Sequence, residues 1–250
     1  MNRKNFIKQS ALMTGAGLVL PGYKSIEKGA VILGANDTIN IGAIGVNGMG
    51  WSDTKSLLKI HGVQLTAICD VDQNVLNKRE AEMMAEGIKV KTFSDYRKLI
   101  DQKDIDAVII GSPDHWHALM MINASEAGKH VYCEKPIGNS VGECRAMVAA
   151  QERYSNVVQV GQWQRSQQHF QDAVKFIKSG ILGPIRTVKV WCYQGWMRPD
   201  PIVANSTPPK GVDSKSGLGP APNKPFNSRR LQFHFRWFWD YAGGLMTDWG

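Results

Sequence analysis

Between residues 39 and 160 the chain alternates short apolar runs with segments whose apolar residues recur at helical spacing. The apolar runs are rich in Val and Ile and predict six buried strands, at residues 39–44, 63–69, 90–93, 107–110, 131–133 and 157–160. The segments between them predict five helices, at residues 52–60, 73–86, 96–100, 116–127 and 141–152. Strands and helices that alternate in this way predict an α/β fold with a doubly wound parallel sheet.

The pattern changes after residue 162. A helix is predicted at residues 170–178 and a longer strand at 185–193, followed by a loop at 199–225 that is rich in Pro, Gly, Ser and Asn. These signals divide the chain into a leader at residues 1–35, a first domain at 36–160 and the start of a second domain at 161–250.

The leader has the pattern of an export signal. Arg3, Lys4 and Lys8 are basic, and residues 11–21 are mildly apolar. That stretch is shorter than the roughly 20 apolar residues needed to span a bilayer. The segment resembles a twin-arginine signal with Lys4 in place of the second arginine, which predicts export to the periplasm. A basic tail without signal function is the alternative, and it would leave the protein in the cytoplasm.

The 250 residues are 43% hydrophobic and carry a formal net charge of +8. Outside the leader and the Arg229-Arg230 pair the basic residues are scattered, which disfavours nucleic-acid binding. The four cysteines form no C-x-x-C pair, so neither a metal site nor a disulfide framework is predicted. The four cysteines are Cys69, Cys133, Cys144 and Cys192.

A glycine-rich turn follows the first predicted strand. Gly45 and Gly50 match the first and third glycines of the G-x-G-x-x-G dinucleotide fingerprint, and Asn47 stands at the middle position with Gly48 and Met49 after it. In that fingerprint, glycine lets the backbone approach a pyrophosphate, whose charge then faces a helix N-terminus. We therefore expect residues 45–50 to bind a dinucleotide.

The second strand ends at Asp70, 20 residues after Gly50 (70 − 50). This is the spacing of the carboxylate that holds the adenosine ribose hydroxyls. Asp72 adds a second negative charge, and together they would repel the 2′-phosphate of NADP. NAD is therefore the predicted cofactor, with NADP disfavoured and helix capping as the alternative role of Asp70.

Two further strand ends carry polar residues. Ser112, Pro113 and His117 follow the fourth strand, and Glu134-Lys135-Pro136 follows the fifth. Ligands bind open α/β sheets at the carboxyl ends of their strands, so these residues are expected to line the cofactor crevice. His115 and His117 form an alternating pair, but with no third ligand in view hydrogen bonding or packing is favoured over a metal.

These motifs together resemble the glucose–fructose oxidoreductase/inositol dehydrogenase/rhizopine catabolism (Gfo/Idh/MocA) family. The resemblance runs from about residue 38 to the end, through the Glu134-Lys135-Pro136 motif to the terminal residues 243–250. It implies a Rossmann domain that binds NAD(P), followed by an α/β domain with a mostly antiparallel sheet that covers the substrate. It also implies that Lys135 contacts both the nicotinamide region and the substrate hydroxyl, and that Asp248 is the aspartate of the second catalytic signature.

The same resemblance places the family's catalytic histidine two positions beyond Gly250. The second domain is therefore expected to be incomplete, with several strands lacking, and the chain to be a truncated product or fragment. When complete, the protein is expected to form a homo-oligomer, and its partner is expected to be a small carbohydrate.

Three functions remain open on the sequence. The first is an NAD-dependent oxidoreductase that acts on a hydroxyl of a sugar, polyol or glycoside by hydride transfer. The second is a redox-neutral glycosidase or epimerase that keeps its NAD bound, and the third is a non-catalytic NAD-binding protein. An aromatic cluster in the second domain is expected to serve mainly as core, with sugar stacking as the alternative: Trp191, Tyr193, Trp196, Trp237, Trp239 and Tyr241.

Overall fold

A computed structural model describes residues 38–191 and 201–249 of the chain. The export-type leader, Cys192, Tyr193 and Trp196 lie outside these residues. The first half is built on one six-stranded sheet whose paired strands are all parallel, in the order β3-β2-β1-β4-β5-β6. The strands are β1 Ile39–Ile44, β2 Val63–Cys69, β3 Lys91–Phe93, β4 Ala107–Ile110, β5 His130–Cys133 and β6 Val158–Val160. This order of parallel strands, with β1 at the centre next to β2 and β4, defines the doubly wound Rossmann-type sheet that the sequence predicted.

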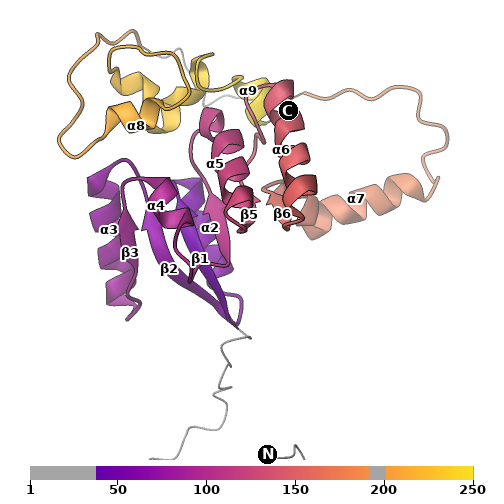
Figure 1. Cartoon of the computed structure of the whole chain (residues 1–250). Helices are drawn as coiled ribbons and strands as arrows, with labels where there is room; N and C mark the ends of the chain where they lie inside the picture. The colour runs from indigo at the N-terminus through magenta and orange to yellow at the C-terminus, as the bar shows by residue number, and fades with distance from the viewer. Residues whose placement is uncertain (1–37, 192–200, 250) are drawn as a thin grey trace, which may run out of the picture. The chain divides into compact units, whose positions relative to one another are not determined.

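Helices cover both faces of the sheet, as Figure 1 shows. They are α2 Met49–Leu57, α3 Gln73–Ala85, α4 Tyr96–Ile100, α5 Asp114–Glu126 and α6 Val141–Tyr154. One buried cluster joins Trp51 of α2 and Leu76 of α3 to residues of the sheet. A second cluster joins Leu99, Met121 and Met147, from α4, α5 and α6, to other residues of the same strands. Because successive strand residues point to opposite faces, each central strand contributes to both clusters.

All predicted strand and helix boundaries in this half are confirmed to within three residues. The largest difference is at α2, which begins at Met49 rather than Ser52. Gly48 precedes it with φ 58° and ψ −124°, a conformation that strongly favours glycine, and it turns the chain directly into the helix. Side-chain caps set other starts: Asp72 accepts from the Asn74 amide at the start of α3, and Ser140 and Glu143 form a capping box at α6.

The second half is irregular apart from short helices. They are η2 Trp163–Ser166, α7 Gln168–Lys178, α8 Ser214–Leu218, η3 Ser228–Arg230, η4 Gln232–Trp237 and α9 Leu245–Asp248. The predicted strand at residues 185–193 is wrong for the part that is described, because residues 185–191 form neither strand nor helix. A strand needs a neighbour to pair its backbone groups, and within the described residues this segment has none. The mostly antiparallel sheet therefore stays a prediction, as does the domain boundary at residue 161.

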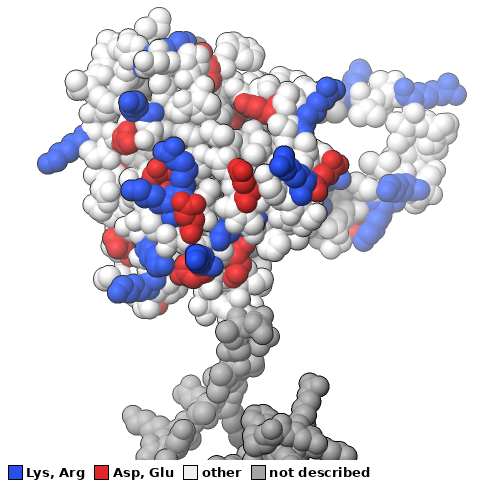
Figure 2. All heavy atoms as spheres, in the orientation of Figure 1, with Lys and Arg blue, Asp and Glu red and all other residues white. Residues whose placement is uncertain are grey.

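Cys69 and Cys133 are buried in strands, Cys144 is partly exposed, and all three are free thiols. Burial raises the pKa of Cys69 and Cys133 above the ordinary thiol value. Basic and acidic side chains are interspersed over the face drawn in Figure 2. Among the described helices, none combines the length and apolar character that crossing a bilayer requires.

Candidate functional site: the carboxyl edge of the sheet

The glycine turn between β1 and α2 is the most closely packed part of the site. Gly45 has φ 77°, and a Cβ added there would lie 2.6 Å from the Ser112 amide nitrogen. A Cβ on Gly50 would collide with the Gly45 carbonyl oxygen, and one on Gly111 would collide with Gly50. Three glycines thus let the ends of β1 and β4 and the start of α2 touch through their backbones. This is the close approach that the fingerprint requires.

The middle of the turn takes its unusual backbone conformation at a glycine. The positive φ is found at Gly48 rather than at Asn47, so Asn47 keeps an ordinary backbone conformation. Asn47, Gly48 and Met49 are all exposed. Among the described residues no side chain caps α2, and its first turn holds no acidic residue, as is typical of helix N-termini that bind anions.

Asp70 lies at the end of β2, next to this turn. Its carboxylate accepts hydrogen bonds from the amides of Val46, at 3.0 Å, and Asp72, at 3.1 Å. Burial raises the pKa of Asp70 to about 6, although these two amides act in the opposite direction. Arg79 supports the same turn by donating from Nε to the Val46 carbonyl oxygen at 2.9 Å.

The loop after β4 places Ser112 and His117 together. His117 is buried, with Nδ1 2.6 Å from the Pro136 carbonyl oxygen and Nε2 2.7 Å from that of Ser112. The ring therefore ties the β4 loop to the loop after β5, and burial lowers its pKa. The Ser112 hydroxyl is buried and has no hydrogen-bond partner among the described residues, which marks it as a polar group that a ligand could satisfy. Pro113 immediately precedes α5.

His115 lies on the other side of this loop. Its Nε2 is 3.3 Å from the Gly217 carbonyl oxygen, and its ring packs edge-on against Tyr241 at 5.0 Å between centroids. Burial lowers its pKa to about 4. Within the described residues no group of three or more His, Cys, Asp or Glu side chains is placed to hold a metal ion.

Glu134 is buried at the end of β5, with 4% of its surface exposed. It accepts a hydrogen bond from the Tyr132 hydroxyl at 3.3 Å and faces Asp53 of α2. Burial, reinforced by Asp53, raises the pKa of Glu134 to about 7, and burial raises that of Asp53 to about 6. Two facing carboxyls of this kind favour a state in which they hold a proton between them.

Lys135 contacts Asp248 of α9. Its Nζ donates to Asp248 Oδ1 at 2.7 Å and to the Asp248 main-chain oxygen at 2.8 Å. Arg236 of η4 approaches the other carboxylate oxygen, with Nε 3.1 Å from Oδ2. Its N–H is not aligned for a hydrogen bond, so this contact is an ion pair and leaves a buried donor unused. One carboxylate is thus held between two cations at the carboxyl edge of the sheet.

Asp114, the first residue of α5, belongs to the same cluster. Burial raises its pKa to about 7, Asp248 adds to the rise, and Arg236 and Lys135 oppose it. Asp53, Asp114 and Arg236 were not predicted as site residues. Asp114 lies inside the loop already selected and its position was a usable signal, but no sequence motif marks Asp53 or Arg236.

The aromatic residues of the second half do not form one core. Tyr241 is buried, whereas Trp191 and Trp239 are 80% and 85% exposed. Trp237 is half-buried in η4, a helical segment in which the alternation expected of a strand does not apply. The expectation that these residues serve mainly as core is therefore wrong for Trp191 and Trp239.

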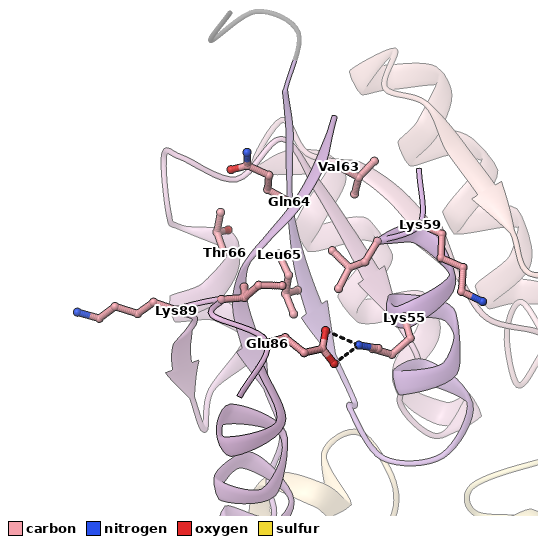
Figure 3. A pocket seen from close by; sticks show the side chains of 10 residues that line it. Lys55, Lys59, Val63, Gln64, Leu65, Thr66, Glu86 and Lys89 are labelled. Carbon is pink, nitrogen blue, oxygen red and sulfur yellow. Dashed lines mark hydrogen bonds and ion pairs between the residues drawn. The ribbon is translucent and has the colours of Figure 1, made fainter. Parts of the chain in front are cut away.

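The best-defined hollows lie away from these groups. One, of about 640 Å³, lies at the amino end of β2 between α2 and α3, where Lys55 and Glu86 form an ion pair at 2.5 Å (Figure 3). Another, of about 430 Å³, is lined by residues 201–205 and parts of η3 and η4. We place the site at the carboxyl edge instead, because the close glycine packing, the uncapped helix and the unpaired Ser112 hydroxyl all lie there.

This donor set fits a dinucleotide. The glycine turn and α2 amides suit a pyrophosphate, Asp70 suits a ribose diol, and Ser112 offers a further hydroxyl. The site therefore defines a dinucleotide-binding Rossmann domain.

Comparison with known proteins agrees with this assignment of a dinucleotide-binding Rossmann domain. Residues 39–162 match the model of an oxidoreductase family with an NAD-binding Rossmann fold, and residues 167–250 match the model of the C-terminal alpha/beta domain of the same family. The chain belongs to the Gfo/Idh/MocA oxidoreductase family.

Individual relatives cover only part of the chain. A Glycosyl hydrolase family 109 protein of Shewanella pealeana is 34% identical over an alignment 171 positions long, gaps included, which covers 61% of this chain and 37% of the relative. The structure of myo-inositol 2-dehydrogenase from Lactobacillus plantarum is 31% identical with a TM-score of 0.55, and covers 59% of this chain and 43% of its own. Scyllo-inositol dehydrogenase from Lactobacillus casei, solved with NAD(H) and scyllo-inositol, is 30% identical with a TM-score of 0.53, over 58% and 42%. The chain thus spans less than half the length of these relatives.

Proposed function

We propose that this protein is an NAD-dependent oxidoreductase that acts on a hydroxyl of a sugar, polyol or glycoside. The observation that carries the proposal is the contact of Lys135 with Asp248 at the end of β5. It brings a cation and a carboxylate from the two family-matched regions to the strand edge where a nicotinamide is expected. The inositol dehydrogenases among the similar structures support a polyhydroxylated substrate.

NAD is proposed over NADP because of the charge at the adenosine end. The Asp70 carboxylate points toward the glycine turn, where it bonds the Val46 amide. Asp72 lies two residues away and its side chain is engaged in capping α3. A 2′-phosphate placed on the ribose would face both carboxylates, whereas a free diol would gain acceptors.

The residues divide the work of hydroxyl oxidation as follows. The bound cofactor supplies the hydride acceptor. Lys135 Nζ hydrogen-bonds the substrate hydroxyl. It gives one of its own protons to Asp248, which lies 2.7 Å away, and takes up the proton of the hydroxyl. Arg236 holds the second oxygen of Asp248 and keeps that carboxylate in place when Lys135 turns to the substrate.

A redox-neutral reaction is the second candidate. In such an enzyme the sugar is oxidised and re-reduced by one cofactor molecule, which stays bound throughout. The name of the Shewanella pealeana relative, a Glycosyl hydrolase family 109 protein, favours this candidate.

Titration of the purified chain with NAD⁺, with NADP⁺ alongside, tests the cofactor assignment. Saturable binding that prefers NAD⁺ is expected, and binding to neither overturns the proposal. Incubation with a panel of sugars, inositols and glycosides then separates the two candidates. A dehydrogenase forms NADH in proportion to substrate consumed, whereas a redox-neutral enzyme consumes substrate without net NADH.

We also propose that the protein is exported. The support is the basic leader with Arg3 and Lys4 followed by a mildly apolar stretch. Cell fractionation of the native host tests this, and a protein confined to the cytoplasm would contradict it.

A further inference from the structure

Residues 210–219 cross the carboxyl edge of the sheet and are anchored on both sides of the glycine turn; we call them the strap. At one end the strap pairs with the segment that follows β2. The Asp213 amide donates to the Val71 carbonyl oxygen at 2.9 Å, and the Gln73 amide donates to the Gly211 carbonyl oxygen at 2.8 Å. The bridge between Asp72 and Val212 is antiparallel. This anchor adjoins Asp70, the proposed ribose-binding residue.

At its other end the strap is held by α5. The Gly217 carbonyl oxygen accepts a hydrogen bond from Trp116 Nε1 at 3.0 Å and lies 3.3 Å from His115 Nε2. Gly219, with φ 51°, lies flat against the Trp116 indole, so that a Cβ there would collide with the ring. This anchor adjoins Ser112 and the end of β4.

The sheet order shows what the strap crosses. β1 lies between β2 and β4, and the glycine turn follows β1. A segment fixed to the residues after β2 and to those after β4 therefore passes over the end of β1. Figure 1 shows α8, which lies within the strap, above these strand ends. On this arrangement we expect the pyrophosphate to bind between the strap and residues 45–50.

We propose that the strap forms the outer wall of the dinucleotide site and holds the cofactor in place, so that release requires its anchors to open. This inference rests on the proposed cofactor and deepens the proposed function. A dinucleotide enclosed in this way exchanges slowly with solvent. Slow exchange suits a reaction in which one bound cofactor molecule oxidises a sugar, re-reduces the same sugar, and then serves the next one.

The rate of NADH dissociation from the full chain tests the strap. This rate is measured from the change in NADH fluorescence after the complex is mixed with excess NAD⁺. Gly219→Ala forces a Cβ into the Trp116 ring, and Trp116→Phe removes the indole donor while keeping an aromatic ring. Loss of an anchor is expected to accelerate release by roughly tenfold, the effect of about one hydrogen bond with its packing. Gly180→Ala is the matched control, because Gly180 also has positive φ, 79°, but has open space around it.

A second measurement needs no variant. Lys210 and Lys215 are exposed within the strap, so trypsin can reach them in the free protein. Saturating NAD⁺ is expected to slow cleavage at these two lysines relative to Lys178 at the end of α7. Wild-type release rates in both strap variants, or cleavage unaffected by bound NAD⁺, would overturn the strap while leaving the cofactor assignment intact. Absence of NADH binding by the wild-type chain would instead overturn the proposed function.

Discussion

Lys135 and Asp248 are 113 positions apart in the sequence, yet the lysine donates to both the side-chain and main-chain oxygens of this one aspartate. The lysine side chain is 24% exposed and the aspartate 9%. In burial, this ion pair is intermediate between exposed ion pairs, which contribute little to stability, and fully buried ion pairs, which are costly to desolvate. Its position at the end of β5 makes function, rather than stability, the reason to test it.

Replacement of Lys135 by Met is expected to abolish most turnover while NAD⁺ binding changes little. A positioned acid/base group contributes roughly 10²–10⁴-fold to rate, whereas the dinucleotide is held mainly by the glycine turn and Asp70. The measurement is kcat on a substrate found in the panel, together with the NAD⁺ dissociation constant. Lys98→Met, at an exposed lysine of α4, is the control. A Lys135→Met protein with near-normal turnover would remove Lys135 from the mechanism.

Arg236 is expected to act through Asp248. Its Nε lies 3.1 Å from Asp248 Oδ2, and its guanidinium lies 4.2 Å from the centre of the Phe233 ring. Arg236→Met should lower kcat by roughly tenfold, as for loss of one charged contact, and should shift the pH profile of kcat. Arg236→Lys should restore part of the rate because it keeps the charge. Equal losses in both variants with an unchanged pH profile would indicate a purely structural role.

The sheet was predictable because its signals are local. Short runs rich in Val and Ile marked β1, β2, β4 and β6, and Gly50 and Asp70 stood at the spacing that a dinucleotide fold imposes. The starts of helices were less accurate. The start of α2 depends on the conformation of Gly48, which the apolar pattern does not report.

The remaining parts of the site depend on contacts between distant segments. Arg236 joins the site only because η4 is folded back toward α9, and Asp53 faces Glu134 only because α2 and the end of β5 come together at the carboxyl edge of the sheet. The strap lies in a stretch whose Pro, Gly and Ser content predicted a loop and nothing about its anchors. The segment at 185–191 has the alternation of a strand, but alternation does not supply the neighbouring strand that it needs.

Asp70→Ala is expected to weaken NAD⁺ binding by roughly 10–100-fold, because the ribose loses a charged acceptor worth about 1.5–3 kcal/mol. NADP⁺ should lose less affinity or gain some, since the variant no longer repels a 2′-phosphate. The measurement is a pair of calorimetric titrations. Binding to the wild type should also weaken below about pH 6, where Asp70 takes up a proton, and this pH dependence should be smaller in the variant. An unchanged NAD⁺/NADP⁺ ratio would contradict the role of Asp70.

Gly50→Ala is expected to disrupt the turn itself. The added Cβ would meet the Gly45 carbonyl oxygen, which is backbone and cannot move aside as a flexible side chain can. The strain should lower the free energy of unfolding by about 1–3 kcal/mol and weaken NAD⁺ binding. Gly142→Ala, in α6, is the control, since the nearest atom to its added Cβ would be Ser140 Oγ at 3.8 Å, an ordinary contact distance. Denaturant midpoints of both variants provide the measurement. Equal midpoints would show that the backbone of the turn can move to accommodate the added Cβ without strain.

Asp114→Asn is expected to change how stability depends on pH. Burial raises the Asp114 pKa in the folded protein to about 7, above its ordinary value of 3.8, so folding favours the protonated carboxyl. The stability that this group contributes is complete below about pH 4 and is lost as the pH rises through about 7. The neutral amide should remove this loss of stability. The free energies of unfolding at pH 5 and pH 8 should then differ by about 1–4 kcal/mol less than in the wild type.

Denaturant unfolding of wild type and Asp114→Asn at the two pH values measures this difference directly. The comparison between variants is required because Asp53 and Glu134 have raised pKa values and contribute in the same direction, whereas His115, whose pKa is lowered, contributes in the opposite one. Asp101→Asn, at an exposed carboxyl after α4, should follow the wild-type curve. An Asp114→Asn curve parallel to that of the wild type would mean that Arg236 and Lys135 keep Asp114 ionised in the folded protein.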